Sequence, residues 1–153
     1  MEKDSNGGDC RIQAKFPFRH SLPIQIRFND IDSLGHVNNT VYFSYFDLGK
    51  TSYFNQVATN PPVDGRATLV AANVNCDFIE PTRIDEKITV STQVESIGHK
   101  SFKMLHAIEN TETGKIKCLC AAIMVVVDIT TGDTRPVPAE WRAAIAAHEG
   151  RSM

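Results

Sequence analysis

Two carboxylates lie in a short polar segment that directly precedes a long apolar stretch of the chain. They are Asp30 and Asp32, within residues 29–36, whose residue types favour a loop. The apolar stretch that begins at Val37 predicts a helix. Unpaired N–H groups accumulate at a helix N-terminus and favour negative charge there. The segment therefore places a carboxylate beside groups that can stabilise an oxyanion.

This pair of features suits the hydrolysis of a thioester. The N–H groups at the start of the helix, above all that of Asn39, can hold a carbonyl oxygen and stabilise the charge that develops on it. A carboxylate beside the polarised carbonyl can attack it, or can activate a water molecule to do so. A thiolate is a good leaving group and needs less acid assistance than an amine. The carboxylate and the N–H group therefore suffice for the hydrolysis of a thioester.

The motif that contains these residues is Asp-x-Asp-x-x-Gly-His-Val-Asn-Asn-x-x-Tyr-x-x-Tyr, which runs from Asp30 to Tyr45. It resembles the signature of the hotdog-fold thioesterases of the 4-hydroxybenzoyl-CoA thioesterase and acyl-CoA thioesterase superfamily. The resemblance extends from about Leu22 to Trp141. It implies that Asp32 is the catalytic carboxylate and that the backbone N–H of Asn39 polarises the thioester carbonyl. It also implies sites between two subunits, and hence a homodimer or homotetramer.

One segment departs from the family pattern. The family often has Glu followed by an Ala-Arg pair after the second tyrosine, where this chain has Asp47-Leu48-Gly49-Lys50. The departure removes the basis for carrying over an auxiliary role of that acid, or a relative's substrate. Acyl chain identity and the choice between CoA and acyl carrier protein are therefore left open.

Each residue of the motif also has a structural alternative. Asp32 could cap the helix or form a turn, and Asp30 is expected to close the loop through backbone N–H groups. His36 either contacts the substrate or acts as an acid, or else it fixes the loop by bonding a backbone carbonyl. Tyr42 and Tyr45 are candidates both for substrate binding and for the core. The sequence does not choose among the basic residues that could bind CoA phosphates: Arg66, Arg83, His99, Lys100 and Lys103.

The spacing of apolar residues predicts the elements that must position the motif. Residues 22–28 alternate apolar and polar as a strand does, and residues 38–57 suit a helix. Its polar residues form one stripe and its other faces are apolar, so we expect the helix to be largely enclosed, with Gly49 allowing close approach to a sheet. After a connecting loop at Asn60–Gly65, four period-two segments follow, at 68–79, 84–97, 101–110 and 115–129.

The predicted fold class is α+β, a hotdog fold in which a curved antiparallel sheet of about five strands wraps around a long central helix. Residues 139–148 predict a short helix on the outside. The segment 119–127 is apolar on both faces, so the C-terminal helix or a second subunit must cover its outer side. We expect residues 1–15 to be a flexible tail and residues 16–153 to be one domain.

Composition excludes several other classes of protein. The net charge is −2, which gives no reason to expect nucleic acid as a partner. The N-terminus lacks the apolar core of a signal peptide, and no stretch approaches the roughly 18 apolar residues of a membrane span. The spacing of the four cysteines fits neither a zinc site nor a disulfide scaffold. We expect a cytoplasmic protein with reduced thiols, no metal and no cofactor, CoA being part of the substrate and product.

Two other functions compete with thioester hydrolysis. A hotdog dehydratase or hydratase would add or remove water on the acyl chain, which requires a histidine and an acid acting on a carbon-bound proton. A non-catalytic acyl-thioester binding module would use Asp32 only as a cap. Release of free thiol from acyl-CoAs separates hydrolysis from both alternatives.

Overall fold

The computed structural model of the chain describes residues 11–57 and 65–153. The first ten residues of the predicted tail, including Cys10, and nearly all of the predicted connecting loop at Asn60–Gly65 lie outside these ranges. Within the described ranges, no helix is long and apolar enough to cross a membrane.

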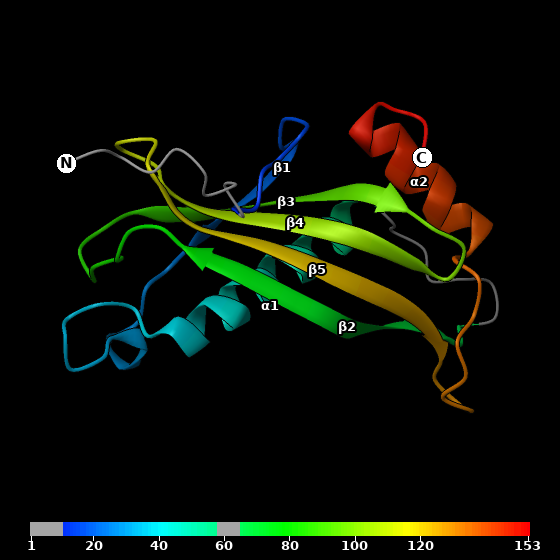
Figure 1. Cartoon of the computed structure of the whole chain (residues 1–153), viewed down its shortest axis with the longest axis horizontal. Coiled ribbons are helices and arrows are strands. Elements are labelled where there is room, and N and C mark those ends of the chain that lie inside the picture. Colours follow the sequence, from blue (N-terminus) through cyan, green and yellow to red (C-terminus); the bar gives the residue numbers. More distant parts are fainter. Residues whose placement is uncertain (1–10, 58–64) are drawn as a thin grey trace, which may run out of the picture.

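Five antiparallel strands form one curved sheet in the order β1-β3-β4-β5-β2 (Figure 1). This confirms the predicted fold class. The last four strands lie close to the predicted segments, although β3 begins four residues later than predicted. The strand bounds are β1 His20–Ile24, β2 Ala67–Phe78, β3 Ile88–Ile97, β4 Ser101–Asn110 and β5 Ile116–Asp128.

Strand β1 ends earlier than the alternating pattern indicated. The prediction ran to Phe28, but the strand stops at Ile24 and a single 3-10 turn, η1, occupies Phe28–Asp30. The carboxylate of Asp30 accepts a hydrogen bond of 2.9 Å from the N–H of Arg27, which turns the chain at this point. A local side-chain bond thus outweighs the strand pattern.

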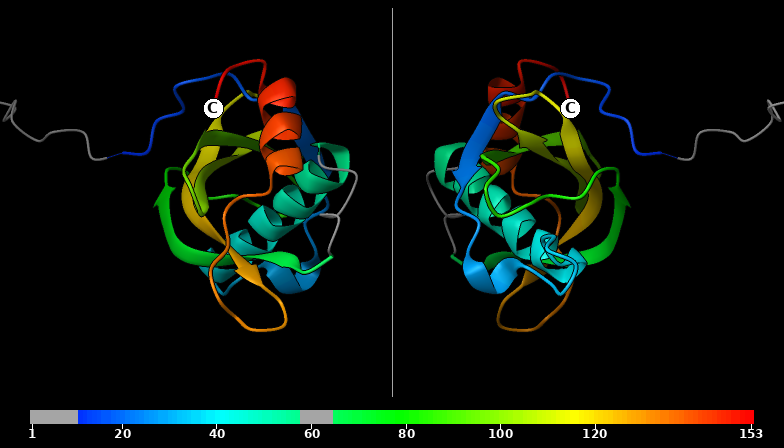
Figure 2. Two further views of the ribbon diagram at one scale, coloured as in Figure 1. Left: turned by 90° about the vertical axis from the view of Figure 1, so that its right-hand side faces the viewer. Right: turned by 90° about the vertical axis from the view of Figure 1, so that its left-hand side faces the viewer.

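The long helix α1, Asn39–Val57, lies in the concave side of the sheet (Figures 1 and 2). Its predicted polar stripe is exposed along its whole length, while Tyr42, Tyr45 and Tyr53 are buried. Two apolar side chains beside the stripe are also exposed, Phe43 by 43% and Leu48 by 52%. One copy of the chain therefore encloses only the sheet side of the helix.

Gly49 brings α1 close to strand β3, as the sequence predicted. A Cβ atom at this position would lie 2.7 Å from the hydroxyl oxygen of Thr92 and 2.9 Å from a methyl carbon of Val90. Real Cβ atoms essentially never approach other atoms so closely. The absence of a side chain thus sets the distance between helix and sheet.

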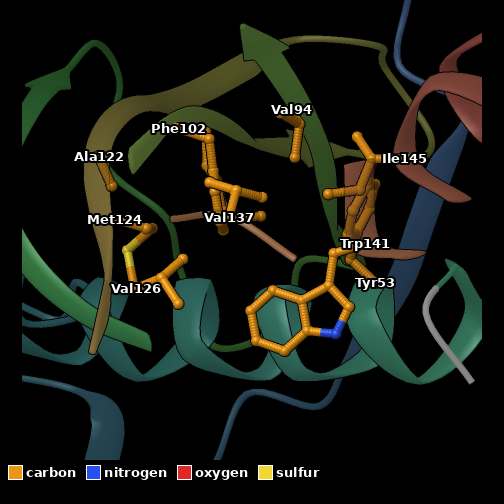
Figure 3. Packing of buried hydrophobic residues seen from close by; sticks show 10 residues of the cluster. Tyr53, Val94, Phe102, Ala122, Met124, Val126, Val137, Trp141 and Ile145 are labelled. Atoms are coloured by element: carbon orange, nitrogen blue, oxygen red, sulfur yellow. The ribbon is translucent and has the colours of Figure 1, made fainter. Parts of the chain in front are cut away.

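The C-terminal helix α2, Ala139–Glu149, packs at one end of the molecule against β3 and α1. Figure 3 shows Trp141 and Ile145 of this helix among buried side chains of α1, β3, β4 and β5. A second buried cluster lies toward the N-terminal end of α1 and includes Val37, Tyr42, Tyr45, Phe46, Cys118 and Cys120. The core therefore has two centres, and the second one supports the segment that contains Asp32.

The outer face of β5 remains partly exposed. Leu119, Ile123 and Val127 are each of intermediate exposure, whereas the alternate residues that face α1 are buried. Helix α2 therefore does not fully cover this face, and its cover by a second subunit stays a prediction.

We expect Gly49→Ala to lower the free energy of unfolding by about 1–3 kcal/mol, the usual cost of overpacking a core. Alanine favours a helix over glycine by about 1 kcal/mol, so the loss would reflect packing and not propensity. Urea unfolding followed by circular dichroism measures the change. Asn55→Ala, on the exposed stripe of the same helix, is the control and should change stability by less than about 0.5 kcal/mol. Equal stability of Gly49→Ala and the parent would contradict this close packing.

Candidate active site

The loop between η1 and α1 is closed by its own main-chain hydrogen bonds. Ile31 and Val37 form an isolated β-bridge, and the N–H of Asp32 donates to the carbonyl of His36 at 2.8 Å. Gly35 donates to the carbonyl of Asp32 at 3.0 Å and has a φ of 77°, a conformation that favours glycine. These bonds hold the side chains of Asp32 and His36 at fixed positions beside the start of α1.

The carboxylate of Asp32 has one engaged oxygen and one that is available. Oδ1 accepts hydrogen bonds from the N–H groups of Leu34 at 2.9 Å and His36 at 3.2 Å. Within residues 11–57 and 65–153, no group donates to Oδ2. The side chain is thus oriented by the loop and still has an oxygen for a ligand.

Asp30 is buried and has a structural role. Its carboxylate accepts hydrogen bonds from the Tyr45 hydroxyl at 2.8 Å, the Arg27 N–H at 2.9 Å and the Arg27 guanidinium at 3.2 Å. Burial alone would raise the pKa of Asp30, but the bonds from Arg27 and Tyr45 lower it below its usual value. Asp30 therefore stays ionised and ties the loop to α1.

The first turn of α1 presents an unpaired N–H group. Asn38 caps the helix, because its side-chain oxygen accepts hydrogen bonds from the N–H of Thr40 at 3.0 Å and from the Thr40 hydroxyl at 2.8 Å. The N–H of Asn38 donates to the carbonyl of Asp30 at 2.8 Å. Among the described residues, none accepts a hydrogen bond from the N–H of Asn39. This group is available at the positive end of the helix.

A cleft of about 360 Å³ brings most of the predicted site residues together. Asp32, His36, Asn39 and Tyr42 all line it. The imidazole of His36 forms no hydrogen bond with the described part of the chain, so the bond to a backbone carbonyl that the sequence allowed is not seen there. Tyr45 lies outside this cleft, in the core, where its hydroxyl donates to Asp30.

The residues of the opposite wall of the cleft were not predicted to belong to the site. It is formed by residues 78–81, at the end of β2 and just after it. The next residue, Thr82, is fully buried; its carbonyl accepts from the N–H of Val37 at 2.8 Å and its hydroxyl accepts from the Tyr42 hydroxyl at 2.9 Å. Thr82 therefore joins the two walls.

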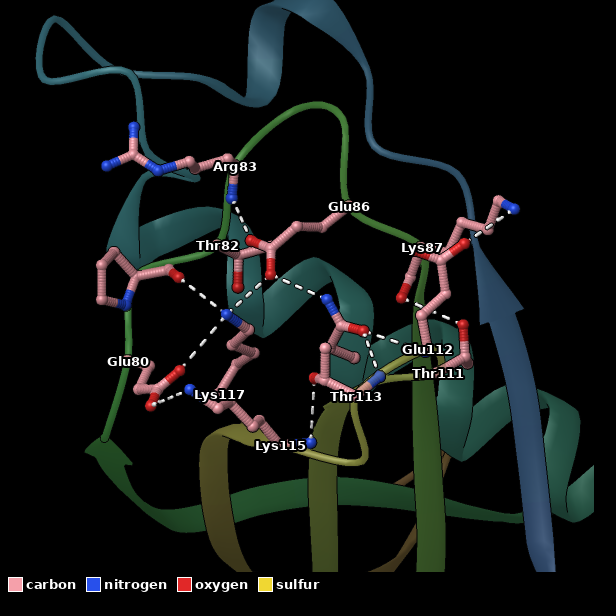
Figure 4. Close-up of polar contacts among 12 residues, drawn as sticks. Glu80, Thr82, Arg83, Glu86, Lys87, Thr111, Glu112, Thr113, Lys115 and Lys117 are labelled. Carbon is pink, nitrogen blue, oxygen red and sulfur yellow. Dashed lines mark hydrogen bonds and ion pairs between the residues drawn. The ribbon is translucent and has the colours of Figure 1, made fainter.

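A buried lysine holds this second wall in place (Figure 4). The ammonium group of Lys117 lies 2.7 Å from the Glu86 carboxylate and donates to the carbonyl of Pro81 at 3.2 Å. Its main-chain carbonyl accepts from the N–H of Ile79 at 2.9 Å. Burial alone would lower the pKa of Lys117, but the bond to Glu86 raises it, so the side chain stays charged. The sequence signal for this role is a lysine inside a mostly apolar strand.

Among the basic residues named as phosphate candidates, Arg83 is nearest to the cleft along the chain. It directly follows Thr82, and Figure 4 shows its side chain extending away from the Lys117 network. Lys103 instead pairs with Glu95 at 2.7 Å, and Arg66 pairs with Asp128 at the far end of β2. His99 and Lys100 follow β3 at the same far end of the sheet.

Comparison with known proteins gives one family. Residues 26–145 match the model of the thioesterase-like superfamily. The protein YsmA of Bacillus subtilis, which has no described function, is 28% identical over 119 residues, or 77% of this chain and 79% of YsmA.

Solved structures agree with this match. A Thermus thermophilus thioesterase, solved with coenzyme A and zinc, is 28% identical, with a TM-score of 0.76 over 88% of this chain and 97% of that one. A thioesterase-superfamily protein of Jannaschia shares the fold, with 22% identity and a TM-score of 0.77 over 88% of this chain and 86% of its own. In the described part of this chain, no three His, Cys, Asp or Glu side chains are arranged to hold a metal ion.

We expect Asp30→Asn to lower the free energy of unfolding by about 1.5–3 kcal/mol at pH 7, the range for hydrogen bonds to a charged group. The folded-state pKa of Asp30 is depressed, so its contribution is fully present above the unfolded value of about 3.9 and is lost as the pH falls through the folded value. The difference in the free energy of unfolding between parent and variant should therefore become smaller below about pH 4. Urea unfolding at several pH values measures it, and a gap that is constant from pH 7 to pH 2 would contradict an ionised Asp30.

Proposed function

This chain belongs to the thioesterase-like superfamily, and we propose that it hydrolyses an acyl-CoA or related acyl thioester in the cleft beside Asp32. One observation carries the proposal: Asp32 and Asn39 line the same cleft. Asp32 has a carboxylate oxygen without a hydrogen-bond donor, and Asn39 has a backbone N–H without an acceptor, among the described residues. A catalytic carboxylate and an oxyanion-binding N–H are the two groups that thioester hydrolysis requires.

In the proposed reaction the thioester carbonyl oxygen accepts a hydrogen bond from the N–H of Asn39. Asp32 takes a proton from a water molecule, whose oxygen bonds to the carbonyl carbon while the N–H holds the developing negative charge. The carbon–sulfur bond then breaks, and the proton passes to the departing thiolate. In the alternative mechanism, Asp32 itself attacks the carbonyl carbon, the carbon–sulfur bond breaks to release the thiolate, and water hydrolyses the resulting anhydride. In both mechanisms His36 is positioned to contact the substrate.

The two ends of the substrate have different surroundings in this proposal. Tyr42 and Phe78 supply apolar walls for the acyl group, and a further cavity of about 170 Å³, lined in part by Phe46 and Val74, lies between α1 and the sheet. Arg83, beyond the cleft wall, is the candidate for the phosphates of CoA. A cytoplasmic location stays a prediction of the composition.

We further propose that two copies of the chain associate through β2. This strand is at the edge of the sheet, and three of its apolar residues are exposed: Val70 by 45%, Val74 by 39% and Phe78 by 46%. A long edge strand with exposed apolar residues favours pairing with another strand. Phe78 also lines the cleft, so a second copy on this edge would lie beside the site and complete one of its sides.

We expect Val74→Pro to convert the dimer to a monomer. In this part of β2 the odd-numbered residues bond to β5, as the bond from Ile79 to Lys117 shows, so the N–H of Val74 faces the free edge. Proline removes that donor without breaking the β5 ladder. Light scattering at micromolar concentration measures the mass, and Val74→Ala is the control, which should remain dimeric. A monomeric parent protein would contradict the association.

We expect Asp32→Asn to lower turnover by at least about 100-fold, because the variant keeps the shape of the side chain but loses its basic oxygen. The assay follows release of free thiol from a panel of acyl-CoAs. Glu80→Gln is the matched control, since Glu80 also lines the cleft with a carboxylate, and it should keep most of the activity.

Three results would contradict the assignment. Full activity of Asp32→Asn, with loss in Glu80→Gln, would move the catalytic role to Glu80. Binding of acyl-CoA by the parent without thiol release across the panel would favour a binding module. Addition of water to an unsaturated acyl chain, with the thioester intact, would favour a hydratase.

A further inference from the structure

Three free cysteines face one another across two paired strands. Cys76 of β2 lies directly opposite Cys120 of β5, and Cys118 lies two residues before Cys120 on the same face of β5. Cys118 and Cys120 belong to the buried cluster beneath the site, and Cys76 packs against that cluster. The proposed hydrolysis uses none of these thiols.

The register defines the geometry of this group. The hydrogen bond of 2.9 Å from the N–H of Ile79 to the carbonyl of Lys117 makes these two residues a hydrogen-bonded pair. Pair types alternate along antiparallel strands, so Cys76 and Cys120, three steps away, form a non-hydrogen-bonded pair, in which the Cα atoms are about 4.5 Å apart. Disulfides span Cα separations of about 4.4–6.8 Å. The diagonal from Cys76 to Cys118 is about 7–8 Å, which is too long.

The three thiols differ in access and acidity. Cys118 is 0% exposed and Cys120 is 1% exposed, whereas Cys76 is half-buried on the edge strand. The neighbouring thiols of Cys118 and Cys120 lower the pKa of Cys76, whereas the Cys76 sulfur and burial raise the pKa of Cys118 and of Cys120. The accessible sulfur is therefore the one stabilised as a thiolate, the reactive form of cysteine.

We propose that Cys76 and Cys120 are a dithiol site at which hydrogen peroxide forms a cross-strand disulfide. The Cys76 thiolate attacks one peroxide oxygen, the O–O bond breaks, and a sulfenic acid and hydroxide result, with sulfur oxidised and peroxide reduced. Cys120 then loses its proton and attacks the Cys76 sulfur. The S–S bond forms, the S–O bond breaks, and the hydroxide that leaves combines with the proton as water.

The bond would lie between the two cavities described above, the cleft and the cavity between α1 and the sheet. Along the inner face of β2, Cys76 lies between Val74, which lines the cavity between α1 and the sheet, and Phe78, which lines the cleft. Cys120 itself lines the first of these. A disulfide here would fix the free edge strand to β5 at the junction of the two cavities.

The experiment treats the full chain with hydrogen peroxide, in a background of Cys10→Ser so that this fourth thiol cannot compete. Intact mass spectrometry should show the loss of two hydrogen atoms, reversed by dithiothreitol. A non-reduced tryptic digest should join the peptide that contains Cys76 to the peptide that contains Cys118 and Cys120. This readout needs no change in the dithiol itself.

Single substitutions then assign the pair. Cys118→Ser should still form the disulfide, whereas Cys76→Ser and Cys120→Ser should lose it; circular dichroism verifies that each variant is folded. Three outcomes overturn the proposal: an unchanged mass, addition of oxygen to Cys76 without a disulfide, or a disulfide that depends on Cys118 and not on Cys120. None of them bears on thioester hydrolysis, which the thiol-release assay tests separately.

Discussion

The buried carboxylate of Asp30 joins the turn after β1 to helix α1. It accepts hydrogen bonds from Arg27, after β1, and from Tyr45 in the second turn of α1, while its own main-chain carbonyl accepts from Asn38. A buried charge is costly unless it is bonded in this way, so these groups can hardly separate without a large loss of free energy. The loop that begins at Ile31 therefore starts from a fixed position.

The fixed position of this loop explains which polar groups beside the cleft have no hydrogen-bond partner. Because Asp30 and Asn38 satisfy the main chain on either side, the loop of Asp32 closes on itself and uses only one carboxylate oxygen to do so. Thr82 then fixes the second wall to Val37 and Tyr42. Among the described residues that line the cleft, one carboxylate oxygen of Asp32, the N–H of Asn39 and the imidazole of His36 have no hydrogen-bond partner in the chain, and these are the groups that the proposed chemistry uses.

The sequence predicted what depends on local periodicity. The strand segments, the exposed polar stripe of α1 and the close approach at Gly49 follow from residue types at fixed spacing, and the motif itself brought Asp32, His36, Asn39 and Tyr42 together. The predicted end of β1 was wrong, because the hydrogen bond from the N–H of Arg27 to the Asp30 carboxylate turns the chain despite the alternation of apolar and polar residues. Thr82 and Lys117 could not be predicted, since their roles depend on which distant segments the sheet order brings side by side.

The two ends of α1 differ in how far a single chain buries their apolar residues. Toward its C-terminus, α2 and the sheet bury Tyr53 in a cluster that also contains Trp141 and Ile145. Tyr53 is therefore buried within a single chain. Toward its N-terminus, Phe78 stays exposed at the cleft, and Phe43 and Val74 stay exposed at the smaller cavity between α1 and the sheet. An incomplete apolar surface costs free energy in water, and it is tolerated where a ligand or a second copy covers it. The exposed apolar residues Phe43, Val74 and Phe78 thus lie on the part of the molecule that contains the candidate active site.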